Sequence, residues 1–162
     1  MGGLLFDHAL YQCALASRTS TIAGVLWHQG ESDCTEDCWP VYEDRCTAIL
    51  QAFRQRLGLE DVPFLVGGLG DYLQNFHDQY IAQNYSRIND ALRRMAQKDP
   101  MMAYVPAEGL GSNPDMLHFC AAAQREFGLR YYTAFKTLER PDKVFIEKPL
   151  PDCVVRGDLE RL

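Results

Sequence analysis

The sequence lacks an excess of positive charge. Its 162 residues include 16 Lys and Arg against 22 Asp and Glu, which gives a formal net charge of −6. Nucleic acids and anionic membrane surfaces attract basic proteins, so this balance argues against both as general partners. We therefore expect no nucleic-acid partner.

The sequence also lacks a long apolar run and a leader. No apolar stretch approaches the roughly 20 residues that a membrane-spanning helix needs. The first eight residues, MGGLLFDH, do not carry the basic region that opens a signal peptide. By default we expect a cytoplasmic location for this chain and no membrane partner.

A disulfide framework and a clear metal-binding pattern are missing as well. Six cysteines are present, but a chain of this length does not need disulfides to stabilise it, and no secretory signal accompanies them. The nearest approach to a metal site is Cys34, Cys38 and Cys46 with His28, but their spacing is not that of a zinc knuckle. We predict reduced thiols, no metal and no organic cofactor. A thiol or zinc protein built on these cysteines is the weaker alternative.

Phosphate-binding loops are also absent. The glycine-rich run GGLGD at residues 67–71 fits neither the G-x-x-x-x-G-K-[ST] loop nor the G-x-G-x-x-G fingerprint. Its glycines indicate a tight turn between a strand and a loop, and residues 109–114 also have the composition of a loop.

What is present is an alternation of helical and strand patterns in a chain of globular composition, with 47% apolar and 23% charged residues. Apolar residues at helical spacing predict helices over 3–16, 40–57, about 81–95 and 123–138, with Gly58 ending the second. Short apolar runs predict strands at 22–27, 62–67 and 101–105. Strands separated by helices pair in parallel, so we predict a three-layer α/β/α fold over residues 1–139. Residues 140–162 are expected to form a C-terminal tail.

The strongest indication of a site is the run WHQGESD at residues 27–33. An apolar strand leads into it, and the run itself is polar and contains a glycine. Ligands of open α/β sheets bind beyond the carboxyl ends of the strands. We therefore place the candidate site after the first strand.

A second candidate lies in DMLHF at residues 115–119. A histidine with a carboxylate three residues away can act as a general base whose imidazole the carboxylate orients. The alternative is structural: Asp115 would cap the last helix and His118 would lie in its first turn.

These two runs, together with PFLVGGLGD at residues 63–71, resemble conserved blocks of the sialate O-acetylesterase and acetylxylan esterase group, a carbohydrate-esterase branch of the SGNH hydrolases. The resemblance extends from about residue 2 to residue 135, with the blocks in the right order. It implies a flavodoxin-like parallel sheet and a serine hydrolase that removes acetyl groups from acetylated carbohydrates without a cofactor.

The resemblance also implies roles for single residues. His118 would be the general base, Asp115 its partner, and Gln29 a donor to the oxyanion. The remaining positions of the first run would shape the site: Gly30 by close backbone approach, Glu31 by ordering the loop, His28 as a supporting or substrate-lining residue, and Trp27 in a sugar subsite or in the core.

The nucleophile is missing from this pattern. In the group that the chain resembles, the serine lies near the start of the domain in a Q-S-N-M-like block, and nothing here matches it. The chain thus resembles a C-terminal portion of such an enzyme with impaired activity. Ser32 is the substitute candidate, since Ser32, Asp115 and His118 follow the chain order of α/β-hydrolases, but the second glycine of G-x-S-x-G is absent.

Two further expectations follow from an incomplete domain. A protein that kept the fold and lost the serine could be a non-catalytic carbohydrate-binding or interaction protein, which is our alternative function. A parallel sheet without its first strands also leaves an apolar edge, so we expect the chain to self-associate.

Overall fold

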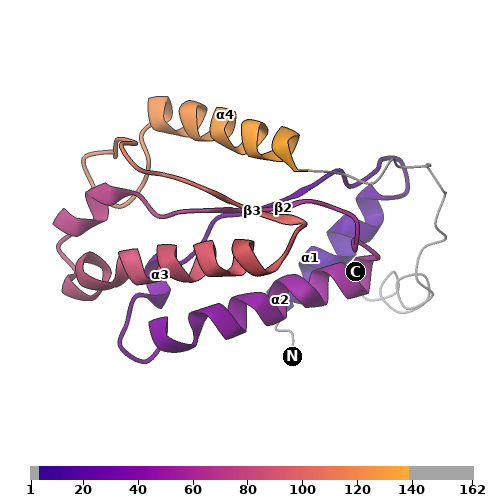
Figure 1. Cartoon of the computed structure of the whole chain (residues 1–162), viewed down its shortest axis with the longest axis horizontal. Coiled ribbons are helices and arrows are strands. Elements are labelled where there is room, and N and C mark those ends of the chain that lie inside the picture. The colour runs from indigo at the N-terminus through magenta and orange to yellow at the C-terminus, as the bar shows by residue number, and fades with distance from the viewer. Residues whose placement is uncertain (1–3, 139–162) are drawn as a thin grey trace.

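The structure is a computed structural model that describes residues 4–138. Three parallel strands form one sheet in the order β1-β2-β3, and helices connect them (Figure 1). The main elements in chain order are α1 (Leu4–Ala16), β1 (Val25–Trp27), α2 (Tyr42–Leu57), β2 (Phe64–Gly67), α3 (Gln79–Lys98), β3 (Met102–Val105) and α4 (Ala121–Thr137). Three 3-10 turns lie between them: η1 (Glu31–Asp33), η2 (Trp39–Val41) and η3 (Asp71–Asn75).

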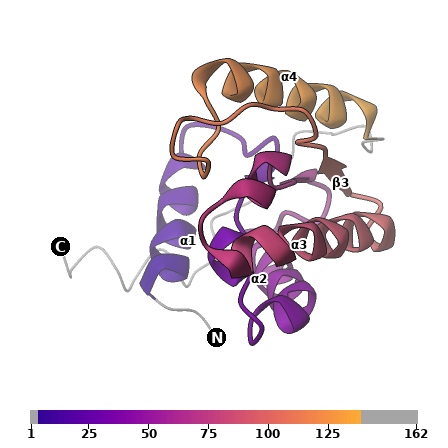
Figure 2. The ribbon, with the colours of Figure 1, turned by 90° about the vertical axis from the view of Figure 1, so that its left-hand side faces the viewer.

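The elements stack in three layers, which confirms the predicted α/β/α fold. Helix α4 covers one face of the sheet, and α2 with α3 covers the other (Figure 1). Helix α1 lies to one side of the layers (Figure 2) and packs on α2, where the rings of Phe6 and Phe53 lie 4.7 Å apart.

Strand β2 is buried on both faces, which explains its continuous apolar run. On one face, the guanidinium of Arg54 from α2 lies 4.0 Å from the ring centroid of Phe64. On the other face, a Cβ atom at Gly67 would lie 1.9 Å from the hydroxyl oxygen of Tyr131 in α4. That hydroxyl donates to the carbonyl of Trp27 at 3.0 Å, so the glycine lets α4 tie β1 to β2.

Strand β1 is short and only partly covered. It begins at Val25, whose N–H donates to the carbonyl of Pro63 at 2.9 Å, so the predicted strand at 22–27 loses its first three residues. Within residues 4–138, β1 pairs with β2 alone. Leu26 leaves 63% of its surface exposed, a large fraction for a leucine in a parallel sheet. The sheet is therefore least complete at β1.

Local signals account for most element ends. Gly58 ends α2 in the left-handed conformation (φ 63°), as predicted, and Asp78 caps α3 by accepting from two backbone N–H groups of its first turn. The predicted start of the second helix at residue 40 is two residues too early: Pro40 lies in η2, and α2 begins at Tyr42.

No helix within residues 4–138 has both the length and the apolarity required to cross a membrane. The predicted tail at 140–162 and the domain boundary at residue 139 lie outside the described residues.

Candidate active site

The segments that follow the three strands meet at one edge of the sheet, because the strands are parallel (Figure 2). His28, after β1, has its ring centroid 5.5 Å from that of Phe119, which follows β3. Tyr72, after β2, donates from its hydroxyl to the carbonyl of Leu117 at 3.2 Å, and its ring lies 5.2 Å from that of Phe119. The two candidate runs of the sequence thus belong to one region: His28 of the first run lies against Phe119 of the second, and Tyr72 packs against the second run.

The loop after β1 packs closely against helices α2 and α3. The carbonyl of Gln29 accepts from the buried hydroxyl of Tyr42 at 2.8 Å. Gly30 has φ 152°, and a Cβ atom there would lie 2.7 Å from Cγ2 of Ile88 in α3. Only glycine fits this position without strain. The close approach seen at Gly30 is thus toward α3, and its predicted role in shaping the site stays a prediction.

The polar side chains of this loop order one another. The carboxamide of Gln29 donates to the carboxylate of Asp33, four residues later. Glu31 lies across the same turn, with its carboxylate 3.8 Å from Nε2 of His28. One N–H of the amide that would bind an oxyanion is therefore given to Asp33 in this structure, and the second N–H is the donor left for a substrate.

His28 packs against two aromatic rings and stays partly exposed. Its imidazole lies 5.5 Å from both Phe119 and Phe127, and 33% of its side chain is exposed. Burial lowers the pKa of His28, while the charge of Glu31 and a hydrogen bond with the backbone of Gly67 act in the opposite direction. This position fits a supporting role better than proton transfer.

Trp27 is half-buried and packs against the hydrophobic core. That placement agrees with the structural alternative for this tryptophan.

The DMLHF run forms the tip of a small hairpin that precedes α4. Its two arms pair at Ser112 and Phe119, and the N–H of Asn113 donates to the carbonyl of His118 at 2.8 Å. Met116 takes a positive φ of 55° at the tip. The hairpin follows β3 through the turn at residues 106–109, and so it carries Asp115 beyond the carboxyl edge of the sheet.

Asp115 and His118 form a closely bound pair. Oδ2 of Asp115 lies 2.8 Å from Nδ1 of His118, and Oδ1 accepts from the backbone N–H groups of His118 and Leu117, both at 3.0 Å. These contacts lower the pKa of Asp115 to about 2, with the side-chain bond to His118 the largest cause, followed by the two backbone bonds.

The pairing sets the chemistry of the imidazole. An ionised carboxylate can only accept, so Nδ1 of His118 carries the proton and Nε2 presents a lone pair. That is the arrangement of a general base held by a carboxylate. The structural alternative for Asp115 is wrong, because Cys120 is the N-terminal cap residue of α4.

Ser32 is not in hydrogen-bond contact with this base. It lies exposed in η1, and among the hydrogen bonds of residues 4–138 none joins it to His118. An activated serine needs such a contact with its base.

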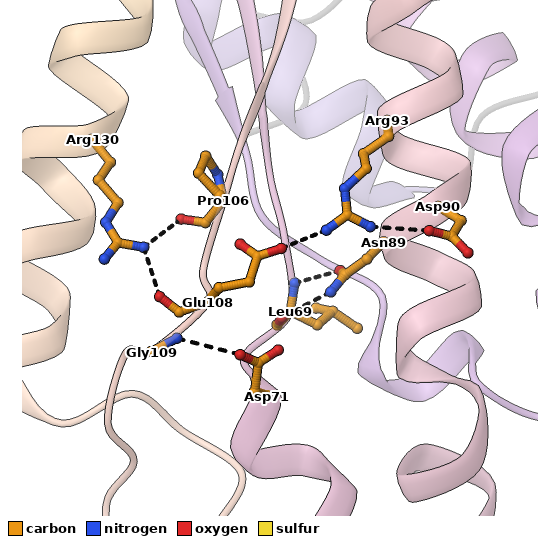
Figure 3. Close-up of polar contacts among 9 residues, drawn as sticks. All are labelled: Leu69, Asp71, Asn89, Asp90, Arg93, Pro106, Glu108, Gly109 and Arg130. Atoms are coloured by element: carbon orange, nitrogen blue, oxygen red, sulfur yellow. Dashed lines mark hydrogen bonds and ion pairs between the residues drawn. The ribbon is translucent and has the colours of Figure 1, made fainter.

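Two residues of this region were missed by the sequence analysis. Tyr72 supports the hairpin, and its pKa is raised by burial and then by the charges of Glu31 and Asp115. Buried Asn89 binds both backbone groups of Leu69, accepting from N–H at 2.7 Å and donating to the carbonyl at 3.0 Å (Figure 3). Asn89 falls on the buried stripe of α3, where a polar residue is a detectable signal. Tyr72 lies in a loop without such a pattern.

Within residues 4–138, the cysteines do not gather into a site. Burial raises the pKa of Cys34 to about 12 and that of Cys46 to about 11, with smaller effects from neighbouring groups. Throughout the described part of the chain, no three His, Cys, Asp or Glu side chains are grouped so that they could hold a metal ion. The zinc alternative therefore finds no support in this geometry.

Comparison with known proteins supports the resemblance. The family model for "carbohydrate esterase, sialic acid-specific acetylesterase" matches residues 1–137. The X-ray structure of a protein from Arabidopsis thaliana has a similar fold, with a TM-score of 0.71, 22% identity, and coverage of 85% of this chain and 55% of that one. This chain thus spans about half the length of the Arabidopsis protein. No curated protein sequence matches significantly. The family match extends over nearly the whole described region, and the chain belongs to the sialic acid-specific acetylesterase family of carbohydrate esterases.

Proposed function

We propose that this chain carries the general-base part of a serine-type esterase that removes O-acetyl groups from carbohydrates. The observation that carries the proposal is the contact of 2.8 Å between Nδ1 of His118 and Oδ2 of Asp115, in a member of a carbohydrate esterase family. The carboxylate fixes the proton on Nδ1, so Nε2 is free to take a proton from a nucleophile.

The proposed reaction proceeds through an acyl-enzyme. Nε2 of His118 takes the proton of a serine hydroxyl as its oxygen attacks the acetyl carbonyl, and Asp115 stabilises the imidazolium that forms. The bond from the carbonyl carbon to the sugar oxygen then breaks, and the imidazolium returns its proton to that oxygen. Water releases acetate by the same two steps. The second N–H of the Gln29 amide, which is not the one given to Asp33, is our candidate donor to the oxyanion.

We further propose that the nucleophilic serine comes from outside the residues described here. Ser32 makes no hydrogen bond with His118, and the chain matches 55% of the Arabidopsis protein's length. An esterase without its nucleophile keeps only a small residual acceleration, in which the base activates water beside the oxyanion donors and binding contacts. We therefore expect impaired activity from this chain alone.

One observation favours the alternative, a non-catalytic carbohydrate-binding or interaction protein. The side chains of His118 and Asp115 are 70% and 47% exposed. Active sites usually exclude water from their reacting groups, whereas a binding surface does not need to.

Acetate release distinguishes the two functions. The chain is incubated with O-acetylated sialic acid and with acetylated xylo-oligosaccharides, and acetate is measured beside a binding titration. We expect slow release that His118→Ala abolishes and His77→Ala leaves unchanged, since His77 is an exposed histidine outside the hairpin. Binding without release would establish the alternative, and release that survives His118→Ala would contradict the proposed base.

A further inference from the structure

The turn at residues 106–109 connects β3 to the hairpin that bears His118, and it is bound from three other elements (Figure 3). Arg130 of α4 donates from Nη1 to the carbonyls of Pro106 and Glu108, both at 3.0 Å. Asp71 of η3 accepts from the N–H of Gly109 at 3.3 Å. Arg93 of α3 pairs with the carboxylate of Glu108.

The two arginines are themselves held in place. Nε of Arg130 donates to Glu126, one helical turn earlier, at 3.1 Å. Arg93 donates to Asp90 at 3.0 Å, and its guanidinium lies 4.6 Å from the ring centroid of Tyr104 in β3. A planar guanidinium fixed at one end presents its remaining donors in a defined direction, which a flexible lysine does not.

The turn determines where the hairpin begins. Ala107 within it and Leu110 directly after it are both buried, and the N–H of Leu110 donates to the carbonyl of Ala107 at 3.1 Å. The hairpin follows at once, since the N–H of Cys120 donates to the carbonyl of Gly111 at 3.1 Å. Any movement of the turn would therefore be passed to the tip of the hairpin.

We propose that Arg130 is a positioning residue for His118, and that Asp71 acts on the same turn from the opposite side. By fixing residues 106–109, they set the hairpin in the geometry in which Asp115 holds the proton on Nδ1 of His118. The importance of Arg130 for catalysis rests on the proposed function, whereas its effect on the position of the hairpin does not.

The tautomer of His118 provides a readout that a purely structural arginine would not change. The full-length chain is labelled with 15N at histidine, and the ring nitrogens of His118 are assigned by loss of their signals in His118→Gln. At a pH where the imidazole is neutral, we expect the unaltered protein to show a protonated Nδ1 and an unprotonated Nε2. In Arg130→Ala and Asp71→Ala, both signals should shift toward the averaged values of a free histidine.

Matched variants separate this effect from a general loss of stability. Arg125 is an exposed arginine on the same helix, so Arg125→Ala should keep the tautomer of the unaltered protein. Arg130→Lys should give an intermediate shift, because an ammonium cannot place two donors in the guanidinium geometry. If Arg130→Ala does not fold, the His118 signals of Arg130→Lys and Asp71→Ala test the proposal in its place.

Unchanged His118 signals in folded Arg130→Ala and Asp71→Ala would overturn the proposal, as would an equal shift in Arg125→Ala. An absence of any esterase activity would refute the proposed function without affecting these signals, so the two failures are distinguishable.

Discussion

The carboxylate of Asp115 binds His118 twice, through the imidazole Nδ1 at 2.8 Å and through the backbone N–H at 3.0 Å. The orientation of the ring is thus fixed relative to its own backbone. Because the pair lies at the tip of a hairpin that starts at the carboxyl edge of the sheet, its position depends on the loops beneath it. The first predictions concern those loops.

Removal of the Asn89 side chain should destabilise the protein strongly. Asn89→Ala leaves the N–H and the carbonyl of Leu69 without partners in a buried region. We expect the free energy of unfolding to fall by about 2–4 kcal/mol, as measured by urea denaturation. Asn75 is exposed in η3, and Asn75→Ala should change the value by no more than about 0.5 kcal/mol. Equal effects of the two variants would show that the Leu69 contacts contribute nothing.

Two glycines with positive φ allow strain to be separated from crowding. Gly30→Ala should lower the free energy of unfolding by about 3 kcal/mol, because its φ of 152° disfavours a side chain and the new Cβ would meet Ile88. Gly109 has φ 75° and open space around it, so Gly109→Ala should cost only about 1–2 kcal/mol. Urea denaturation of both variants tests this, and a Gly30→Ala cost no larger than that of Gly109→Ala would contradict it.

The lowered pKa of His28 makes stability depend on pH. Its value in the unfolded chain is 6.5, and burial lowers the pKa in the folded protein. Between the two values the unfolded state binds more protons, so stability rises with pH in that window. The stability that neutral His28 contributes is fully present above about pH 6.5. It decreases as the pH falls toward the pKa of His28 in the folded protein. Urea denaturation from pH 5 to pH 8 should show this slope flattened in His28→Gln and retained in His77→Gln. An unchanged slope in His28→Gln would assign the dependence to other groups.

The partly uncovered β1 strand should cause self-association. Leu26 and Leu129 have the same exposed fraction, 63%, but Leu26 lies in β1 and Leu129 on α4. We expect light scattering to give a mass above the 18.4 kDa of one chain, and Leu26→Glu to return it toward that value. Leu129→Glu is the matched control and should leave the mass unchanged. A monomeric unaltered chain at high concentration would contradict the prediction.

Much of the fold was predictable because its signals are local. The continuous apolar run of β2, the left-handed Gly58 and the stripe of α3 each have a direct physical consequence, and the structure confirms all three. Strand ends were less predictable. The first strand begins at Val25, where pairing with β2 starts, and pairing depends on a residue far away in the sequence.

The site was predictable only where its residues are close in sequence. Asp115 and His118 bind each other across three positions, so their pairing could be inferred from spacing. The contacts of Tyr72 with Leu117 and of Arg130 with Pro106 join separate elements, and no local sequence pattern predicts them. The roles of Gln29 and Ser32 depend on a substrate and a nucleophile, and they stay predictions.

The central claim is that His118 acts as a base without a serine of its own in this chain, and pre-steady-state hydrolysis of p-nitrophenyl acetate tests it most directly. The account predicts slow, linear release of p-nitrophenol that His118→Ala abolishes and Ser32→Ala does not affect. A rapid burst stoichiometric with the protein and lost in Ser32→Ala would contradict it.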